Sequence, residues 1–551
     1  MKIAVLSNIN MEPLRTFLNA DEKVICDYGQ YMQELLDENS SLYSGNPDII
    51  FLHLDGEEFA KDVLYGLVQT KDAENILGQR LDIVFEAAKK YLMVREHATL
   101  LFSTLVFPPF YFINYLDTNS DYSFSSTEHF LNEKILKFAA SIANVFVLDW
   151  KRPVLFYGYK AMYDEKFWFL GRIKYTNKAL KVLSEEISNC ADAVKGNIKK
   201  VLVLDLDNTL WGGIIGEDGI NGIKLSEDGI GKAYRDFQFV VKAMKDLGVI
   251  LAINSKNNPE DAINVFANHP MMVLKEEDFV ILKINWNNKV DNMKEIAQEL
   301  NLGLDSFVFI DDNGREREMV RQNSVVAVPE FPDDPAQLKE WFLKDIVYKY
   351  FPKVFITKED AGKAGQYKAN IKRGDLSKHL NIDEFIKSLE IRIEVYVNDG
   401  RFVQRTAQLT QKTNQFNVTT RRYTEADIEQ FMKKGNVYAL SYTDRFGDEG
   451  IVGCAVVSIN GDAAYLDALL MSCRVIGRNV EFLFLRRILS MLSDKGVKVV
   501  KSGFIPTNKN IVARDFFDKS GFIALGEDNG VFTYECNVVD ALRHLTAKYI
   551  A

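Results

Sequence analysis

The sequence predicts an α/β protein with three domains. Short apolar runs of four or five residues alternate with amphipathic helical segments, which is the pattern of a parallel sheet covered by helices. Several runs lead into polar residues such as Ser7, Asp205 and Asp311, and the carboxyl ends of strands form the ligand-binding edge of such sheets. With 551 residues, the chain is too long for one hydrophobic core. We predict domains at residues 1–195, 196–345 and 385–551, with a linker at 346–384.

Composition and charge narrow the class of protein. The hydrophobic fraction of 47% and the charged fraction of 26% are typical of globular proteins. A net charge of −10 disfavours nonspecific binding to nucleic acid. The five cysteines include no Cys-x-x-Cys pair, which argues against a disulfide framework or a zinc site and is typical of a reducing cytosol. No signal-peptide pattern or membrane-length apolar run occurs, so we expect a cytoplasmic protein with neither nucleic acid nor membrane as a partner.

The first 195 residues alternate strand-like and helix-like segments. Four apolar runs predict strands at residues 2–6, 48–52, 99–102 and 144–148. Apolar residues at helical spacing between 130 and 142 predict an amphipathic helix before the last strand. We therefore expect a flavodoxin-like parallel sheet with helices on both faces.

The stretch that begins at residue 201 carries the strongest chemical signal. Residues 201–204 are all apolar, as in a strand buried on both faces, and Asp205 and Asp207 follow. Two carboxylates this close repel each other unless a cation lies between them, and Mg²⁺ takes such oxygen ligands. The alternative is an Asp-rich turn after a strand. Asn208 and Thr209 extend the pattern to Asp-x-Asp-x-Thr, which favours the metal site.

Three segments further along each carry a polar residue at a predicted strand end or helix start. Ser255 follows the apolar run 249–253, Lys289 begins an amphipathic helical segment, and Asp311 and Asp312 follow the run 307–310. Each segment alone has a plain structural explanation, because a Ser after a strand often caps a helix and a Lys at a helix start is often solvated. Their occurrence together and in this order is specific.

Asp-x-Asp-x-Thr followed by these segments resembles motifs I to IV of the haloacid dehalogenase (HAD) superfamily. The resemblance implies that Asp205 attacks phosphorus and becomes an aspartyl phosphate, while Asp207 acts as general acid and then as general base. It also implies four groups that hold the phosphoryl oxygens, Ser255, Lys289, Asn208 and Thr209.

The same resemblance implies a Mg²⁺ cofactor. Asp205, Asp207 through its backbone carbonyl, and Asp311 would bind the ion, and Asp312 would orient these ligands from an outer shell. The cation would let an anionic nucleophile approach an anionic phosphate.

The spacing of the motifs leaves little room for a cap domain over the site. Much of the chain between Asp205 and Ser255 is needed for a helix that ends at Gly248, so the glycine-rich segment 211–230 can form only a small hairpin flap. A capless, Rossmann-like HAD domain has an open site. Either another domain covers it or the substrate is large, and a phosphate on a carrier protein fits as well as a sugar phosphate.

The last domain has the pattern of an α+β fold. Antiparallel strands are predicted at residues 391–395, 437–442, 452–459 and 464–471, and a helix at 480–492. The loop at residues 474–479 resembles the acyl-CoA loop of GNAT acetyltransferases, and the segment 510–522 resembles their later motif. The resemblance implies that two splayed strands admit a phosphopantetheine arm, which Arg474, Gly477, Arg478 and Asn510 would contact. Asn479 replaces a small residue of that loop, which favours carrier-bound pantetheine over free CoA.

Two features of this domain leave alternatives open. The amide-rich stretch 408–417 suits hydrogen bonding to a ligand or a partner domain, or it is a polar surface loop. Cys473, just before the loop, is either a buried apolar residue or an acyl acceptor.

Ser7 follows the first predicted strand, in the place of the nucleophile of an SGNH-type esterase. Leu6-Ser7-Asn8 is not Gly-Asp-Ser, and no His occurs near the domain's end, although His53 could face the same cleft. Without a base a Ser hydroxyl is a weak nucleophile, so we predict an SGNH-like but non-catalytic domain that docks a partner or covers the substrate.

The sequence Asp-Leu-Asp-Asn-Thr-Leu-Trp-Gly-Gly at residues 205–213, within this three-part layout, resembles the FkbH-like branch of the HAD superfamily. That branch implies transfer of a glyceryl unit from a glycolytic phosphate to a phosphopantetheine carrier, with loss of phosphate. Two alternatives stay open: a stand-alone phosphatase of a small metabolite or glycan precursor, and a binding scaffold with a vestigial site. The complete motif set argues against the scaffold.

Overall fold

The computed structural model describes residues 1–95, 97–356, 365–371, 373, 376, 381–528 and 530–549. They form two compact units, Met1–Val194 with Thr424–Asp427 and Lys195–Tyr423 with Ile428–Ala551, and each is described by itself. Part of the predicted linker at 346–384, namely residues 357–364, 372, 374–375 and 377–380, lies outside the described residues. Within the described part, no helix combines the length and apolar character needed to cross a membrane.

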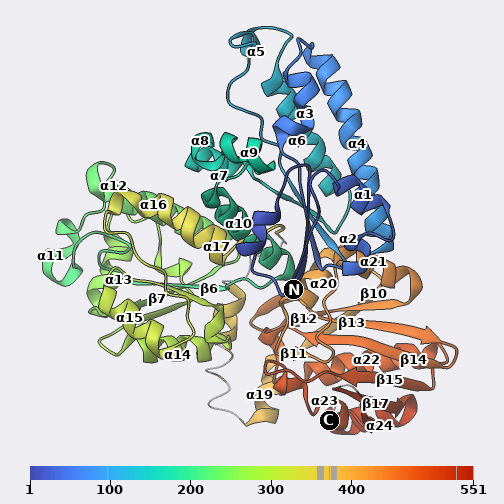
Figure 1. Cartoon of the computed structure of the whole chain (residues 1–551). Coiled ribbons are helices and arrows are strands. Elements are labelled where there is room, and N and C mark those ends of the chain that lie inside the picture. The colour runs from blue at the N-terminus through green and yellow to red at the C-terminus, as the bar shows by residue number, and fades with distance from the viewer. Residues whose placement is uncertain are drawn as a thin grey trace. The chain divides into compact units, whose positions relative to one another are not determined.

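The first unit contains a five-stranded parallel sheet in the order β2-β1-β3-β4-β5 (Figure 1). This strand order is flavodoxin-like, so the parallel sheet that the alternating pattern predicts is present. Its strands are β1 (Lys2–Ser7), β2 (Glu22–Ile25), β3 (Ile49–His53), β4 (Thr99–Ser103) and β5 (Val145–Leu148). Every residue of β3 and β4 is buried, so both faces of the sheet are covered. The sequence did not predict β2, because this short edge strand begins with the charged pair Glu22-Lys23.

Helices pack around this sheet. They are α1 (Tyr31–Leu36), α2 (Ser41–Gly45), α3 (Gly56–Leu64), α4 (Thr70–Val94), α5 (Leu116–Asn119), α6 (Phe124–Ala140), α7 (Lys151–Tyr157), α8 (Tyr159–Met162), α9 (Glu165–Gly171) and α10 (Asn177–Lys195). The predicted helix at 130–142 is α6, which starts earlier because the Ser123 hydroxyl caps it by accepting a hydrogen bond from the Ser126 N–H at 3.1 Å.

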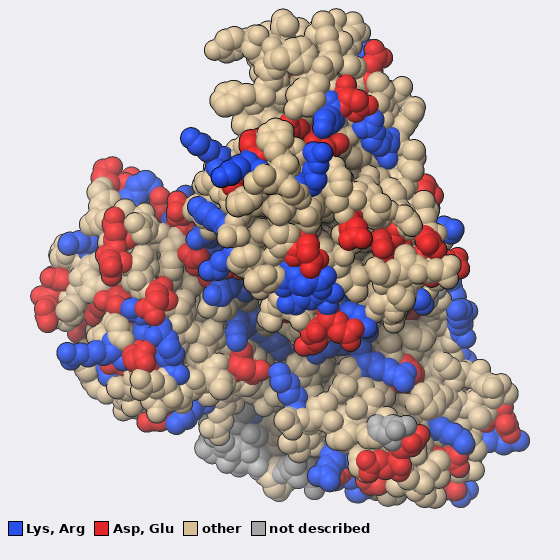
Figure 2. Space-filling model, in the orientation of Figure 1, with Lys and Arg blue, Asp and Glu red and all other residues tan. Residues whose placement is uncertain are grey.

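The surface around α5 is poor in charge. Phe110 and Tyr115, which precede this helix, are 90% and 84% exposed. Figure 2 shows few charged side chains on this part of the visible face.

The second unit begins with a four-stranded sheet in the order β8-β7-β6-β9, in which all neighbours are parallel (Figure 1). Its strands are β6 (Val201–Leu204), β7 (Ile250–Ser255), β8 (Ile281–Ile284) and β9 (Phe307–Ile310). The apolar residues at 325–329 predict a closing strand of this sheet, and this prediction is wrong. Only Ala327 makes a bridge, to Val308, because Val325 is turned to solvent and Pro329 has no N–H to donate.

Helices flank this sheet as well. They are α11 (Ile215–Gly222), α12 (Gly229–Asp246), α13 (Pro259–Asn268), α14 (Lys289–Leu300), α15 (Gly314–Asn323), α16 (Leu338–Trp341) and α17 (Tyr348–Tyr350). A π-helical segment, Phe342–Val347, joins the last two into one continuous helical stretch. The expected flap contains a short helix, α11, and a bridge from Gly212 to Lys224 closes its base.

The second unit also contains an eight-stranded, mostly antiparallel sheet, β10-β12-β13-β14-β15-β17-β16 with β11 beside β14. Its strands are β10 (Arg392–Val397), β11 (Phe416–Asn417), β12 (Asn436–Asp444), β13 (Gly447–Asn460), β14 (Ala463–Met471), β15 (Val499–Phe504), β16 (Ile523–Asp528) and β17 (Val531–Asn537). Its helices are α19 (Ile382–Leu389), α20 (Val403–Lys412), α21 (Glu425–Lys434), α22 (Val480–Asp494), α23 (Phe516–Lys519) and α24 (Val538–Tyr549). The predicted α+β layout is therefore present.

Strands β14 and β15 pair in parallel only from Ala463 to Leu466 and then diverge, as the splayed-strand prediction requires. The gap between them is filled by the chain itself. The Val418 N–H donates to Leu469 O at 3.1 Å, and the Ile505 N–H donates to Val418 O at 2.8 Å. The backbone groups expected to receive pantetheine already have partners.

Candidate active site

The carboxyl edge of the β8-β7-β6-β9 sheet gathers side chains from four segments that lie far apart in the sequence. Asp205 follows β6, Ser255 ends β7, Lys289 starts α14 after β8, and Asp311 follows β9. All four are buried. They meet because parallel strands end at the same edge of a sheet.

Lys289 lies between two of these carboxylates. Its Nζ is 2.9 Å from Asp205 Oδ1 and donates a hydrogen bond to Asp311 Oδ2 at 2.6 Å. Burial alone would lower the pKa of Lys289, but the two carboxylates outweigh it and raise that pKa. The ammonium group is therefore fully charged at neutral pH and is available to a phosphate bound beside Asp205.

A buried amide network fixes the start of α14. Asn254 Nδ2 donates to Lys289 O at 2.9 Å, and Asn292 Nδ2 donates to Asn254 Oδ1 at 3.0 Å. Asn288 caps the helix by accepting a hydrogen bond from the Val290 N–H at 2.8 Å. The role of Asn254 and Asn292 was not predicted, because the apolar pattern says nothing about which amides meet inside the fold.

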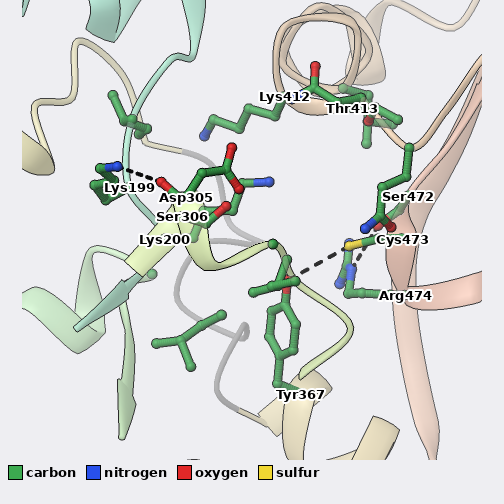
Figure 3. Close-up of a pocket in the computed structure, with 18 of the residues that line it drawn as sticks. Lys199, Lys200, Asp305, Ser306, Tyr367, Lys412, Thr413, Ser472, Cys473 and Arg474 are labelled. Atoms are coloured by element: carbon green, nitrogen blue, oxygen red, sulfur yellow. Dashed lines mark hydrogen bonds between the residues drawn. The ribbon is translucent and has the colours of Figure 1, made fainter. Parts of the chain in front are cut away.

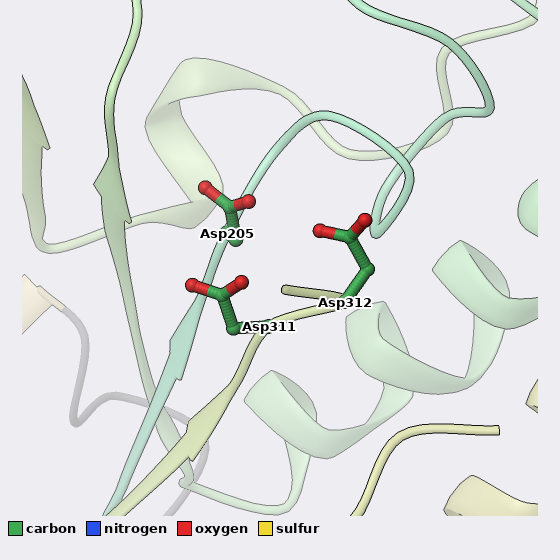
Figure 4. A group of neighbouring side chains, drawn as sticks. All are labelled: Asp205, Asp311 and Asp312. Atoms are coloured by element: carbon green, nitrogen blue, oxygen red, sulfur yellow. The ribbon is translucent and has the colours of Figure 1, made fainter. Parts of the chain in front are cut away.

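Asp312 joins Asp205 and Asp311 in a compact carboxylate group. One oxygen from each of the three lies within 4.8 Å of the others, and Figure 4 shows them above the ends of two neighbouring strands. Burial, with repulsion from Asp205, raises the pKa of Asp312 to about 6 although Lys289 opposes the shift. Burial and Asp205 likewise raise the pKa of Asp311 above its ordinary value against the effect of Lys289. Lys289 thus offsets only part of the negative charge of the three carboxylates.

This group fits a divalent cation of the Mg²⁺ type. Asp205 Oδ1 is buried and, among the described residues, has no hydrogen-bond donor, since the nearby Lys289 ammonium is not aligned with it. Hard cations take several carboxylate oxygens in such a geometry. The Asp312 carboxylate belongs to this group, although it was predicted to act from an outer shell, and the Asp207 carboxylate does not, which is compatible with the predicted role of the Asp207 backbone carbonyl.

The Asp207 carboxylate is held away from this group. It accepts hydrogen bonds from Trp211 Nε1 at 2.9 Å, the Ile215 N–H at 3.0 Å and Asn257 Nδ2 at 2.9 Å. Only its backbone could serve a metal at Asp205. The partner Asn257, which also donates to Ser255 Oγ at 3.2 Å, was missed because it belongs to no recognisable spacing.

Asn208 and Thr209 differ in what they can offer to a phosphate. Asn208 has a left-handed backbone (φ 51°), and its Oδ1 accepts a hydrogen bond from the Gly213 N–H at 2.8 Å. It therefore braces the base of the flap rather than presenting that oxygen to a ligand. The Thr209 hydroxyl is buried and has no partner among the described residues, so it keeps a free donor.

Comparisons with known proteins place the chain in a family. No family model matches it, and no curated protein does. A solved structure does match, the N-terminal part of the protein BF1531 from Bacteroides fragilis, containing a phosphatase domain and complexed with Mg. The identity is 30% and the TM-score 0.59, over 65% of this chain and 95% of that one. The chain belongs to this phosphatase-domain family.

Acetyltransferase structures match a smaller part. Ard1 from Thermoplasma volcanium shares 17% identity at a TM-score of 0.22, over 27% of this chain and 98% of that one. The ribosomal-protein-S18-alanine N-acetyltransferase from Escherichia coli shares 10% identity at a TM-score of 0.22, over 27% and 94%. Identities and TM-scores this low support no conclusion about the function of the matched part of this chain.

The predicted pantetheine groups have other partners. Arg474 donates to Gln366 Oε1 and to Glu449 Oε2, and Arg478 donates to Asn370 Oδ1 at 2.7 Å. Asn510 Nδ2 donates to Asn417 O at 2.9 Å and so holds the segment that fills the strand gap. Gly477 adopts a positive φ of 82° in a turn. In this structure the two arginines are buried in ion pairs and the gap between the strands is filled, and contact of these residues with a pantetheine arm stays a prediction.

The amide-rich stretch 408–417 is not the polar surface loop of the second alternative, whereas its binding of a ligand or a partner domain stays a prediction. Its first half lies in α20, where Gln408 and Thr410 are fully buried. The Thr410 hydroxyl donates to Ala407 O at 2.8 Å and accepts from the Tyr423 N–H at 2.9 Å. The Thr410 hydroxyl therefore forms hydrogen bonds with backbone groups of the same chain. Cys473 is half-buried rather than fully buried.

The first unit contains a Ser–His pair, but not the expected one. His53 Nδ1 lies 2.7 Å from the Ser103 hydroxyl, and His53 Nε2 lies 2.6 Å from the Tyr175 hydroxyl. Ser7 Oγ instead accepts a hydrogen bond from the Ile9 N–H at 3.2 Å. Burial lowers the pKa of His53 to about 3, so the ring is neutral. All these side chains are buried, away from any substrate.

We therefore expect the chain to lack esterase activity. A neutral His53 without a carboxylate partner, hydrogen-bonded to buried hydroxyls, has neither the geometry nor the access to activate Ser7. Hydrolysis of p-nitrophenyl acetate by the full chain should equal that of the Ser7→Ala and Ser103→Ala variants. A rate above background that falls in either variant would refute this expectation.

Proposed function

We propose that the chain is a Mg²⁺-dependent phosphatase of the HAD type. The observation that carries the proposal is the buried group of Asp205, Asp311 and Asp312 with Lys289 between the first two. Membership of a family whose solved relative contains a phosphatase domain complexed with Mg supports it. Because the motif set is complete, a binding scaffold with a vestigial site is disfavoured.

In this mechanism Asp205 supplies the nucleophile. A carboxylate oxygen of Asp205 attacks phosphorus, the P–O bond to the alcohol breaks, and Asp207 gives its proton to the leaving oxygen. A water molecule then attacks the aspartyl phosphate, Asp207 takes a proton from it, and inorganic phosphate leaves. Mg²⁺, held by Asp205, Asp311, Asp312 and the backbone of residue 207, would offset negative charge on the phosphoryl group. Lys289, Ser255 and the free Thr209 hydroxyl would hold its oxygens.

We propose a phosphorylated small molecule as the substrate, with release of phosphate coupled to transfer of an acyl (glyceryl) unit to a phosphopantetheine carrier, as the FkbH-like pattern implies. Because the flap that contains α11 is small, the substrate need not fit into a closed active site. A specific observation favours the alternative, a stand-alone phosphatase of a small metabolite or glycan precursor. That observation is the segment Phe416–Asn417 with Val418, which fills the gap where the carrier's arm would lie.

The test is phosphate release by the full chain from a panel of sugar, glyceryl and acyl phosphates. We expect turnover with millimolar Mg²⁺ and at least about a hundredfold loss when EDTA removes it, since the cation lowers the barrier by several kcal/mol. Equal rates with Mg²⁺ and EDTA for every ester would refute the proposal.

The same panel with and without a holo carrier protein separates the two candidate functions. Mass spectrometry of the carrier would detect a glyceryl thioester, which the coupled reaction forms. Phosphate release that is indifferent to the carrier, with no acylated product, supports the stand-alone phosphatase.

A further inference from the structure

One amide side chain joins two groups of the candidate active site. Asn257 lies in the loop between β7 and α13, two residues after Ser255, and it is buried. Its Nδ2 donates to Asp207 Oδ2 at 2.9 Å and to Ser255 Oγ at 3.2 Å. A single nitrogen therefore connects the carboxyl group that would transfer protons with a hydroxyl group that would hold the phosphoryl oxygens.

The neighbouring charge fixes the orientation of this amide. An Asn side chain offers two N–H donors on its nitrogen and one carbonyl oxygen as acceptor. If the amide were turned over, its oxygen would take the place of Nδ2, 2.9 Å from a carboxylate oxygen of Asp207, and the two acceptors would repel each other. The two N–H groups of Asn257 therefore point to Asp207 and Ser255.

The hydrogen bonds of Asp207 leave one of its two oxygens able to exchange a proton with a substrate. Asp207 Oδ1 accepts from Trp211 Nε1 at 2.9 Å and from the Ile215 N–H at 3.0 Å, so both of its lone pairs are used. Oδ2 accepts from Asn257 and keeps its second lone pair. Because the last torsion of an Asp side chain is broad, bonds to one oxygen alone leave the carboxyl plane loosely defined. The bond from Asn257 to the other oxygen fixes that plane.

The Ser255 hydroxyl is oriented by the same amide. A Ser hydroxyl has one hydrogen to donate and two lone pairs that accept. Ser255 Oγ uses one lone pair to accept from Asn257, and its own hydrogen has no acceptor among the residues that the structure describes. The O–H group must point away from the N–H of Asn257, so it is available to a phosphoryl oxygen.

This hydrogen-bonded bridge lies at the carboxyl edge of the sheet. A cavity of about 340 Å³ lies at the opposite edge, where residues that precede β6 and β9 line it (Figure 3). Lys199 and Lys509 belong to its lining, and none of the three bridged side chains is among the lining residues that the structure describes. The four residues of β6 separate the two edges by about 10 Å or more. Substitution of Asn257 therefore tests the carboxyl edge.

We propose that Asn257 is a positioning residue for phosphate release: it makes Asp207 Oδ2 the atom that gives and takes the proton, and it turns the Ser255 hydroxyl toward the phosphoryl group. This role rests on the proposed function. When the P–O bond to the alcohol breaks, its electron pair stays on the leaving oxygen, and the proton on Oδ2 moves to that oxygen. When water attacks the aspartyl phosphate, its oxygen bonds to phosphorus, one of its protons moves to Oδ2, and the electron pair of the broken bond returns to the Asp205 carboxylate. Asn257 itself exchanges no proton.

Esters that differ in their need for an acid test this role. A sugar or glyceryl phosphate expels an alkoxide, which needs a proton, whereas an acyl phosphate expels a carboxylate, which does not. Asn257→Ala in the full chain with Mg²⁺ should lower kcat/KM about 10²-fold for the sugar or glyceryl ester, because a misplaced acid no longer meets the leaving oxygen. For the acyl phosphate the loss should be about tenfold or less, as for one weakened hydrogen bond. A purely structural effect would lower both values equally.

Asn257→Asp separates hydrogen bonding from shape. The substitution keeps the size of the side chain but replaces the donating amide by a carboxylate that would face Asp207. We expect kcat/KM to fall at least as far as in Asn257→Ala, for whichever ester the chain turns over. Asn258→Ala is the matched control, because Asn258 is the next residue, is exposed and donates to Asp261 Oδ2 at 3.1 Å. Its kinetics should be those of the wild type.

Thermal unfolding of the three variants, followed by circular dichroism, monitors the fold. The positioning role is refuted if Asn257→Ala lowers kcat/KM equally for the two classes of ester, or if Asn257→Asp is as active as the wild type. The second criterion decides if the wild-type chain accepts only one class. If the wild-type chain released phosphate from no ester, the proposed function would be overturned and the role of Asn257 with it.

Discussion

Replacing Asp205 with Asn is expected to lower kcat for phosphate release by about 10³-fold or more. The amide is a far weaker nucleophile than the carboxylate, and no other carboxylate occupies the end of the central strand β6. The fold should survive the change, because Lys289 keeps its 2.6 Å hydrogen bond to Asp311. Steady-state kinetics on the best ester of the panel, with circular dichroism to monitor folding, measures both effects.

Asp246→Asn is the matched control for this variant. Asp246 is an exposed carboxylate at the end of α12 in the same unit, so its loss should leave kcat and KM unchanged. Near-normal turnover in Asp205→Asn would rule out an aspartyl phosphate. A loss of activity shared by Asp246→Asn would point to a general electrostatic effect instead.

Lys289→Ala should raise KM and lower kcat together, with kcat reduced about 10²- to 10³-fold. Its ammonium group is buried between two carboxylates, so it would contact the phosphoryl group in both the bound substrate and the transition state. The variant should also be less stable by about 3 to 5 kcal/mol without Mg²⁺, because Asp205 and Asp311 lose their buried counter-charge. Added Mg²⁺ should recover part of that loss. Kinetics and thermal unfolding with and without the ion measure these effects.

Lys294→Ala serves as the control on the same helix. Lys294 is 59% exposed and pairs only with Asp291 at the surface, so its removal should cost little. If Lys289→Ala left kcat, KM and stability unchanged, Lys289 would have no part in holding phosphate.

Much of the architecture could be predicted from local pattern. Strands β1, β3, β4, β6, β7 and β9 lie within a residue or two of the predicted runs, because buried parallel strands are almost purely apolar. The edge strand β2 was missed because it begins with the charged pair Glu22-Lys23. The strand predicted at 325–329 is absent, because only Ala327 of this apolar run pairs with a neighbouring strand.

The sequence alone determined that Asp205, Ser255 and Asp311 would meet, because each lies at the end of a predicted strand of one parallel sheet and all such strands end at one edge. Lys289 was placed with them only by the resemblance to the HAD motifs, since the strand before it, β8, was not predicted. Tertiary structure decided what depends on neighbours across the fold. It turned Asp207 toward Trp211 and Asn257, brought Asp312 to the carboxylate group, and filled the gap beside β14 with the chain's own backbone. It also gathered lysines from position 199 to position 509 around one cavity. Periodicity encodes which face of an element is buried, but the partners of a buried polar group are set only when distant elements pack together.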